Sequence, residues 1–271
     1  MKKIKISCIG IVIIIVLLLS WYLIDRFSYS NPQPYYSVKA THNTTLTIGI
    51  IGDSWVSNGK LDSLIHNKLL EKGFENKVLS SGHPGARSKI IYQNLFKEKE
   101  KEQSSKFIIE NHPDYCVLVS GVNDAISQVG SNFYTHHVVL IVNTLLHYKI
   151  TPVIVELPEF GIVEATNELG FIPRERDILS AKFTNSGEID NIRTYREALV
   201  RELEVKNLKD SVILIGFDKV CDDYSKYLEL YFGSSHLSKK GNEKFSQIIT
   251  NELCKRINSI NKIQPHFGFN R

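Results

Sequence analysis

The sequence predicts an α/β fold: a three-layer α/β/α sandwich around a mostly parallel five-stranded sheet. From residue 46 onward, short runs rich in Val, Ile and Leu alternate with longer amphipathic runs, and such alternation is typical of parallel sheets. The apolar runs lack a regular polar alternation, which indicates strands covered on both faces. We expect strands at 46–51, 77–80, 115–120, 152–156 and 212–217, and helices near 60–72, 88–103, 134–149, 191–206 and 239–257.

The composition is that of an ordinary globular protein. Of the 271 residues, 42% are hydrophobic and 23% are charged, so the chain can form one domain with a substantial core. The net charge is only +4, and no block of Lys and Arg interleaves with aromatic residues. We therefore expect no nucleic acid among the partners.

The four cysteines do not form an obvious disulfide framework. Cys8 lies near the N-terminus, which leaves an odd number in the rest of the chain. Cys116 lies within an apolar strand and is expected to be a buried thiol. A bridge between Cys221 and Cys254 stays an open alternative.

Residues 1–27 predict a cytoplasmic N-terminus followed by a transmembrane anchor. Three lysines precede an uncharged run over 6–24, which would span roughly 28 Å as a helix, close to the ~30 Å of a bilayer core. Trp21 and Tyr22 lie where interfacial aromatic residues are expected. The alternative, a cleaved signal peptide, lacks its small-residue cleavage site. We therefore expect a single-pass cell-membrane protein, with the membrane as a partner and the domain after residue 27 extracytoplasmic.

The rest of the chain divides into three parts. Residues 28–45 are polar, contain two prolines and read as a linker. Residues 46–260 form the predicted domain, and 261–271 a C-terminal tail. Within the domain, the long stretch 157–190 has no strand of its own and is expected to form a lid or substrate wall.

Polar and glycine-rich residues follow three consecutive predicted strands. The first strand runs into Gly52-Asp53-Ser54, the second into "SSGHPGARS", and the third into "SGVNDA". Taken singly, each has a structural explanation as a helix cap or a tight turn. Taken together, they lie at the carboxyl ends of strands, where open parallel sheets bind ligands. The pattern therefore favours a functional site with Ser54 as its nucleophile.

A nucleophilic serine needs a base, and His236 is the best candidate. It lies in "YFGSSHLSKKGNEKF", just before the last predicted helix. The alternative is a loop histidine ahead of an N-cap at Ser238. The chain contains no H-x-x-x-H, C-x-x-C or phosphate-loop motif, so we expect neither a metal nor a cofactor.

These four segments, in this order, resemble the conserved blocks of the SGNH (GDSL-type) hydrolase superfamily over about residues 46–257. The resemblance implies a flavodoxin-like SGNH fold and a catalytic set of four residues. Ser54 would be the nucleophile, Gly85 and Asn123 the oxyanion donors, and His236 the base. Gly85 is preferred to Gly82 because the family's G-x-x-G turn uses its second glycine.

The resemblance further implies a membrane-anchored serine esterase that cleaves acyl esters, above all acetyl esters, on carbohydrate or cell-envelope polymer through an acyl-enzyme. One alternative is an O-acyltransferase that passes the acyl group to a cell-surface polysaccharide, beside a membrane-embedded acyl-transfer partner. Another is a degenerate, non-catalytic glycan-binding or scaffold protein.

One position departs from the family's pattern. The family places an Asp three residues before the histidine, and this chain has Gly233 there. Three interpretations stay open. A backbone carbonyl orients His236, or a carboxylate from Asp222, Asp223 or Glu229 replaces the missing one, or the domain is inactive.

Overall fold

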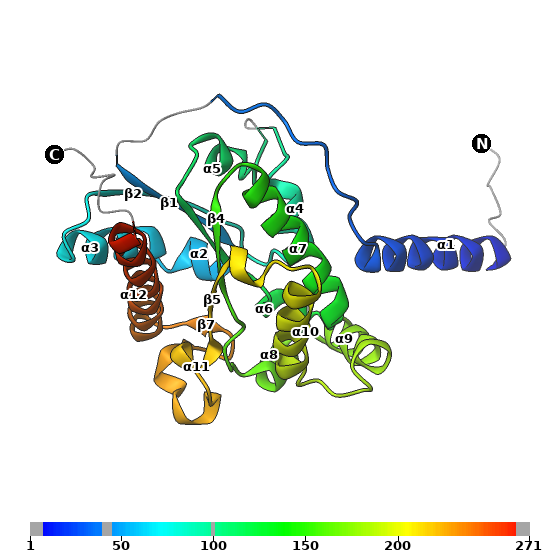
Figure 1. The fold of residues 1–271 in the computed structure, drawn as a ribbon. Coiled ribbons are helices and arrows are strands. Elements are labelled where there is room, and N and C mark those ends of the chain that lie inside the picture. Colours follow the sequence, from blue (N-terminus) through cyan, green and yellow to red (C-terminus); the bar gives the residue numbers. More distant parts are fainter. Residues whose placement is uncertain (1–7, 40–44, 99–100, 264–271) are drawn as a thin grey trace.

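A five-stranded parallel sheet forms the centre of the domain (Figure 1). The computed structural model describes residues 8–39, 45–98 and 101–263. The strand order is β2-β1-β3-β4-β5, and every neighbouring pair in this sheet is parallel. The strands are β1 (Leu46–Gly52), β2 (Asn76–Gly82), β3 (Tyr115–Val119), β4 (Thr151–Val155) and β5 (Ile213–Ile215). The predicted sheet is therefore confirmed.

Helices cover both faces of the sheet, as expected for a three-layer fold. Figure 1 shows α3 (Leu61–Glu71) and α12 (Lys239–Ile263) on one side. On the other side lie α4 (Ser88–Asn94), α7 (Ser131–His147) and α10 (Ile192–Val205). The order of the strands reverses between β1 and β3. Open parallel sheets bind ligands at such a switch point, beside the carboxyl ends of the two strands.

The helix predicted over 88–103 is shorter than expected. α4 ends at Asn94, and a separate helix, α5 (Lys106–Glu110), follows. The backbone N–H of Ser105 donates to the carbonyl of Asn94 at 2.8 Å, which closes the intervening loop. The sequence after α4, "LFKEKEKEQSS", alternates charges and offers no apolar face that could pack a longer helix.

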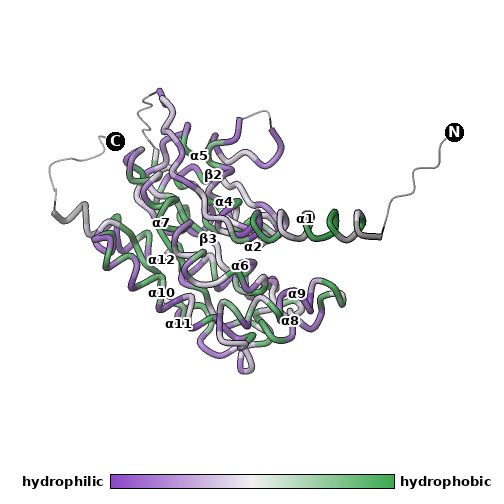
Figure 2. Tube along the Cα trace, turned by 90° about the vertical axis from the view of Figure 1, so that its right-hand side faces the viewer, coloured by the Kyte–Doolittle hydropathy of each residue, from purple (hydrophilic) through white to green (hydrophobic). Residues whose placement is uncertain are grey.

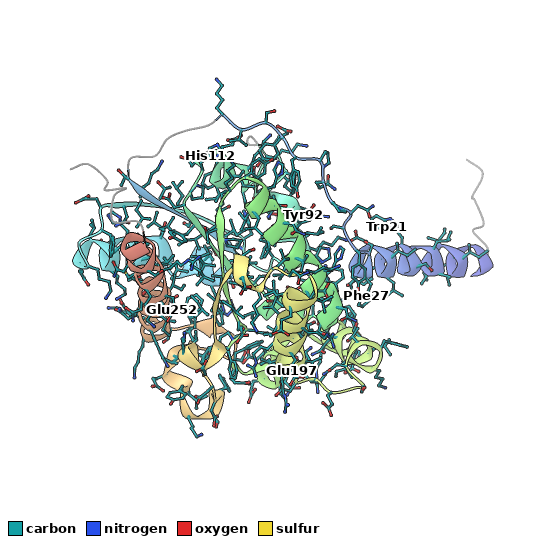
Figure 3. All side chains as sticks on the ribbon, in the orientation of Figure 1. Trp21, Phe27, Tyr92, His112, Glu197 and Glu252 are labelled. Atoms are coloured by element: carbon teal, nitrogen blue, oxygen red, sulfur yellow. The ribbon has the colours of Figure 1, made fainter. Side chains whose placement is uncertain are left out.

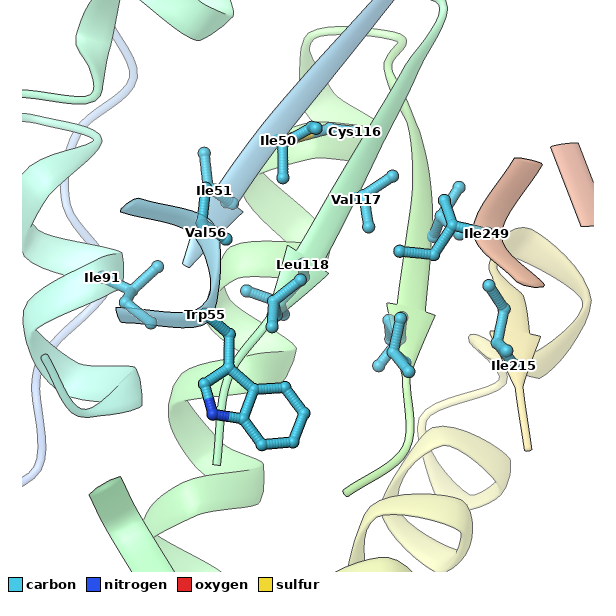
Figure 4. Packing of buried hydrophobic residues seen from close by; sticks show 14 of the residues in the cluster. Ile50, Ile51, Trp55, Val56, Ile91, Cys116, Val117, Leu118, Ile215 and Ile249 are labelled. Atoms are coloured by element: carbon cyan, nitrogen blue, oxygen red, sulfur yellow. The ribbon is translucent and has the colours of Figure 1, made fainter. Parts of the chain in front are cut away.

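The buried core fixes the start of α2 (Ser54–Asn58), the short helix that follows β1. Trp55 and Val56 are each only 3% exposed. Burying apolar side chains of this size stabilises the fold by about 1.5–3 kcal/mol each. Their packing therefore holds the residue before them, Ser54, in one place. Figure 4 shows them among buried residues of β1 and β3, which include Ile50, Ile51, Val117 and Leu118.

The N-terminal helix α1 (Cys8–Phe27) projects from the domain (Figures 1 and 2). Among the residues that the structure describes, no helix combines the length and the apolar character needed to cross a bilayer. The expected single-pass membrane topology is contradicted by this finding. The last turn of α1 instead packs on the folded domain, where Arg26 forms a buried ion pair of 2.6 Å with Asp177.

The segment after α1 lies along the domain. Residues 28–39 belong to the predicted linker and are described by the structure. In this segment, backbone N–H groups donate to tyrosine hydroxyls of the domain. The N–H of Gln33 donates to the hydroxyl of Tyr92 at 2.7 Å, and the N–H of Tyr36 donates to the hydroxyl of Tyr148 at 2.9 Å. Tyr92 is labelled in Figure 3. Residues 40–44 of this linker, and 264–271 of the predicted tail, lie outside the described residues.

The cysteines of the domain are unpaired. Cys116, Cys221 and Cys254 are all free and buried. The expected buried thiol in the third strand is confirmed, and burial raises the pKa of Cys116. The bridge that the sequence left open between Cys221 and Cys254 is not formed.

Candidate active site

The turn after β1 presents Ser54 at the carboxyl edge of the sheet. The strand ends at Gly52, where a Cβ atom would lie only 2.4 Å from the carbonyl oxygen of Val119. Asp53 then caps α2, because its carboxylate accepts the N–H of Trp55 at 3.0 Å. Ser54 is the first residue of that helix and is 7% exposed. A glycine and a cap thus turn the chain out of the strand directly before the serine.

The turn after β2 places Gly85 beside this serine turn. Gly85 has a φ of +74°, a left-handed conformation that favours glycine, although a Cβ there would meet no atom within 4 Å. The N–H of His83 donates to the carbonyl of Gly52 at 2.9 Å, so the two turns are joined. Within the described residues, the backbone N–H groups of Ser54 and Gly85 have no hydrogen-bond acceptor. Both are therefore free to bind an oxygen atom of a ligand.

Asn123 joins all three turns. It lies in α6 (Val122–Ile126), the short helix after β3. Its Nδ2 donates to the carboxylate of Asp53 at 3.3 Å and to the carbonyl of Ala86 at 3.1 Å. The structure thus brings the predicted oxyanion residues to one edge of the sheet. Both amide hydrogens have partners, so a bond from Asn123 to a substrate would replace one, and the longer bond to Asp53 is the weaker.

Two buried carboxyl groups, those of Asp53 and Asp124, lie beside Asn123. From the sequence, these residues were expected only as possible helix caps or turn residues. Asp124 accepts the N–H of Ser88 at 2.8 Å and its hydroxyl at 2.6 Å, which fixes the start of α4. Burial raises the pKa of Asp53 to about 7, and the neighbouring Asp124 adds to this rise. Burial also raises the pKa of Asp124 to about 6. The oxyanion edge therefore contains two carboxyl groups that ionise near neutral pH.

His236 lies in a small hairpin on the surface. It begins β7 (His236–Leu237), which pairs with β6 (Tyr231–Phe232) in an antiparallel two-stranded sheet. A cavity of about 750 Å³ is lined by both Ser54 and His236. The indole Nε1 of Trp55 donates to the carbonyl of Ser235 at 2.8 Å and ties the hairpin to α2. The structure therefore brings the predicted nucleophile and base to one cavity.

No hydrogen bond joins the hydroxyl of Ser54 to the imidazole of His236 among the described residues. Catalytic hydrogen bonds are often long or poorly aligned without substrate. The structure also places the candidate carboxylates elsewhere. Asp223 pairs with Lys226 at 2.9 Å, and Glu229 pairs with Lys240 at 3.0 Å.

Asp222 makes no hydrogen bond or ion pair with His236 either, so within the described part of the chain no carboxylate holds the imidazole. Within the same described residues, no backbone carbonyl accepts a hydrogen bond from the imidazole of His236. Gly233, which occupies the position of the family's Asp, has a φ of +65°, and a Cβ at this residue would meet no atom within 4 Å. The turn therefore favours glycine through its backbone conformation and leaves space for a side chain.

The stretch 157–190 holds the hairpin and does not line the cavity. It forms α8 (Ile162–Glu168) and α9 (Phe171–Thr184). The hydroxyl of Ser234 donates to Glu168 at 2.9 Å, and the N–H of Gly161 donates to the carbonyl of Ser234 at 2.9 Å. None of the described residues that line the cavity belongs to this stretch. This stretch therefore supports the turn before His236, and the lid or substrate wall expected from the sequence stays a prediction.

Comparisons with known proteins identify the fold. No family model matches the chain, and no curated protein matches it in sequence. The esterase EstA from Pseudoalteromonas sp. superposes with a TM-score of 0.55 and 13% identity, covering 79% of this chain and 99% of that one. The acetyl xylan esterase AlAXEase gives 0.54 and 16%, covering 78% and 99%. A lipase/acylhydrolase from Enterococcus faecalis gives 0.52 and 17%, covering 78% and 96%. The chain thus has the fold of GDSL-type lipases and esterases.

Proposed function

We propose that this chain is a serine ester hydrolase of the SGNH (GDSL) type, with Ser54 as nucleophile and His236 as base. The observation that carries the proposal is the meeting of these two side chains in one cavity at the carboxyl edge of the sheet. The free N–H groups of Ser54 and Gly85 and the amide of Asn123 lie at the same edge. The fold shared with esterases and lipases supports the same chemistry.

The reaction proceeds in two halves. His236 takes the proton of the Ser54 hydroxyl while the serine oxygen bonds to the acyl carbon, and the carbonyl electrons move onto the carbonyl oxygen. When the electrons on this oxygen re-form the carbonyl double bond, the bond between the acyl carbon and the alcohol oxygen breaks. The imidazole then gives its proton to the departing alcohol oxygen. Water then attacks the acyl-enzyme with the same base, which releases the acid and restores the serine.

The oxyanion donors act on the charge that develops in the first half. The N–H groups of Ser54 and Gly85 have no acceptor to give up among the described residues. Asn123 must exchange its 3.3 Å bond to Asp53 for a bond to the oxyanion. A donor of this kind is typically worth about 10²- to 10³-fold in turnover.

An acetyl or other acyl ester on carbohydrate or cell-envelope polymer is the substrate that we propose. A neighbour in fold, AlAXEase, is an acetyl xylan esterase at 16% identity, which supports this class. Transfer of the acyl group to a sugar hydroxyl would use the same acyl-enzyme, with the sugar in place of water. The competing candidate, a non-catalytic glycan-binding or scaffold protein, is favoured by one observation: His236 has no hydrogen-bond partner among the described residues.

A fluorophosphonate probe tests the proposal, because it labels only an activated serine. We expect the wild-type protein to be labelled and Ser54→Ala and His236→Ala to remain unlabelled. Ser57→Ala is the matched control, since Ser57 lies on the same helix and its hydroxyl, within the described residues, bonds only to the carbonyl of Ser54 and to Asn58. The neighbour EstA has been captured inhibited by monoethylphosphonate, a related phosphorus group. A folded wild-type protein that stays unlabelled would replace this proposal with the non-catalytic alternative.

A further inference from the structure

The cavity at Ser54 includes His236 but not the other two oxyanion donors of the proposed site. Its lining continues from α2 to the start of α3, to the hairpin of β6 and β7, and to the start of α12. Neither Gly85 nor Asn123 lines it. In the proposed reaction the imidazole gives its proton to the departing alcohol, so that alcohol lies on the His236 side. The cavity is therefore the place for the alcohol part of the ester.

The charges around this cavity are unbalanced. Lys60 and Lys239 line it, and both are exposed. Neither forms an ion pair among the described residues. Of the described residues in the lining, only Glu243 carries a carboxylate, and it pairs with Lys68 at 3.1 Å. The cavity thus presents two uncompensated positive charges.

Both lysines stand where local preferences disfavour them. Lys60 is the N-cap of α3 with a φ of 50°, a left-handed conformation, and it makes no side-chain capping bond. Ser, Thr, Asp and Asn are the preferred residues at an N-cap. Lys239 is the first residue of α12, where a positive charge opposes the helix dipole. Positions that depart from local preference without a structural gain are commonly functional.

The remaining lining fits a polar ring-shaped ligand. Phe232 is 78% exposed and offers a free aromatic face at the cavity. Asn58 adds an amide group whose Nδ2 has no acceptor among the described residues and can bond to a hydroxyl. An aromatic face with a nearby amide suits a sugar or another polyol, and the lysines add a site for its negative charge.

From these contacts, we infer that the cavity binds the alcohol part of an ester that carries a negative charge, with Lys60 and Lys239 as specificity-determining residues. The inference rests on the proposed function, because the assignment of the alcohol side follows from the role of His236. A carboxylate on a sugar ring or a phosphate on a polyol would supply the same charge.

Matched ester pairs test the inference. Acetylated methyl glucuronide is compared with acetylated methyl glucoside, and acetylglycerol phosphate with acetylglycerol. We expect the wild-type protein to have a higher kcat/KM for the charged member of at least one pair. The pair that shows the preference identifies carboxylate or phosphate as the source of the charge.

Neutral variants of the lysines complete the experiment. Lys60→Met and Lys239→Met should each lower the charged-to-neutral ratio of kcat/KM by about threefold, mainly through KM, because exposed charge pairs are individually weak. Lys182→Met on α9 removes the same charge outside the cavity lining and should leave the ratio unchanged. Equal kcat/KM for both members of both pairs would overturn the inference. So would lysine variants that lower both members alike.

Failure of the proposed function would look different, because no ester would be cleaved and no probe would label Ser54. In that case, binding of methyl glucuronide, methyl glucoside, glycerol phosphate and glycerol is measured by calorimetry on the wild-type protein and the three variants. Binding of a charged ligand that weakens in Lys60→Met and Lys239→Met, but not in Lys182→Met, would support the anionic ligand class. Equal binding of charged and neutral ligands, or no binding, would overturn it.

Discussion

The oxyanion edge and the base hairpin of the proposed site are built in opposite ways. At the oxyanion edge, defined by the turns after β1, β2 and β3, Asp53 and Asp124 are fully buried and bond to neighbouring turns. In the base hairpin, residues 231–237, the imidazole of His236 is exposed and has no hydrogen-bond partner among the described residues. One half of the site is therefore organised by the core, and the other depends on a surface turn.

The difference follows from how each half is anchored. Parallel strands end at a common edge, so the three turns meet wherever the sheet forms. The base hairpin consists of two strands of two residues each. It is held at Ser234, whose hydroxyl donates to Glu168 of α8 and whose carbonyl accepts the N–H of Gly161. The carbonyl of Ser235 adds a bond from the indole N–H of Trp55. We expect changes at the oxyanion edge to affect both stability and activity, and changes at His236 to affect activity alone.

The largest effect is expected at the base. His236→Ala should lower ester turnover by about 10⁴-fold or more, as losses within catalytic triads do. Its melting temperature should match that of the wild-type protein, because the imidazole makes no hydrogen bond in the described structure. Turnover of a small acyl ester and thermal unfolding measure the two effects. A variant that loses stability would contradict the separation of the two halves.

The oxyanion edge should respond in both measurements. Asn123→Ala should lower turnover by about 10²- to 10³-fold, because one oxyanion donor is lost. It should also lower the free energy of unfolding by about 1–3 kcal/mol, because the carboxylate of Asp53 and the carbonyl of Ala86 lose their donor. Denaturant unfolding measures this loss. An Asn123→Ala protein as stable as the wild type would show that the amide does not hold the three turns together.

The buried carboxyls at the oxyanion edge predict a pH-dependent stability. Because the folded pKa of Asp53, about 7, lies above its unfolded value of 3.8, the folded state binds more protons between these pH values. The free energy of unfolding should therefore fall as the pH rises from about 4 to 7, by at most about 1.4 kcal/mol per pH unit for one carboxyl.

Asp53→Asn should flatten this dependence, since the amide cannot ionise. Asp210→Asn is the control, because Asp210 is exposed on the surface. Urea unfolding across this pH range measures both variants. If the free energy of unfolding of Asp53→Asn changes with pH as steeply as that of the wild-type protein, ionisation of Asp53 does not cause the dependence.

The two halves also differed in how well the sequence predicted them. The strands and their parallel direction could be predicted from the alternation of apolar and amphipathic runs. The sheet edge that carries Ser54, Gly85 and Asn123 could therefore also be predicted from the sequence. The bonds of Asn123 to Asp53 and Ala86 depend on the register of three strands, which no single segment contains. In the hairpin, the sequence singled out His236 and the missing Asp at Gly233. It could not show that Asp223 and Glu229 pair with lysines.

The N-terminal prediction shows where a local pattern misleads. The uncharged run over 6–24 predicted a transmembrane anchor, which the structure contradicts. The buried pairing of Arg26 with Asp177, 151 residues away, has no local signal. No sequence pattern links Lys60 with Lys239 either, because their shared cavity forms only when α3 and α12 lie side by side.

The smallest effect is expected where the hairpin lacks a carboxylate. The described structure has no acidic partner for His236, so Gly233→Asp should supply one and raise turnover several-fold near neutral pH, where the imidazole must accept a proton and carry its charge. The space around Gly233 admits the side chain, and Asp tolerates its left-handed backbone better than most residues. Gly233→Asn is the matched control, because it has the same shape and backbone tolerance without the charge.

Single replacements of Asp222, Asp223 and Glu229 by Ala should change turnover by less than about twofold, or near 0.4 kcal/mol. The reason is that none of them contacts the imidazole in the described structure. Turnover of a small acyl ester, measured across pH, separates the cases. If one of these replacements costs far more than Gly233→Asp gains, a displaced carboxylate reaches His236 during catalysis, and the base hairpin closes further than the structure shows. If Gly233→Asp and Gly233→Asn behave alike, charge at this position does not limit the reaction, and the hairpin works as a serine–histidine dyad.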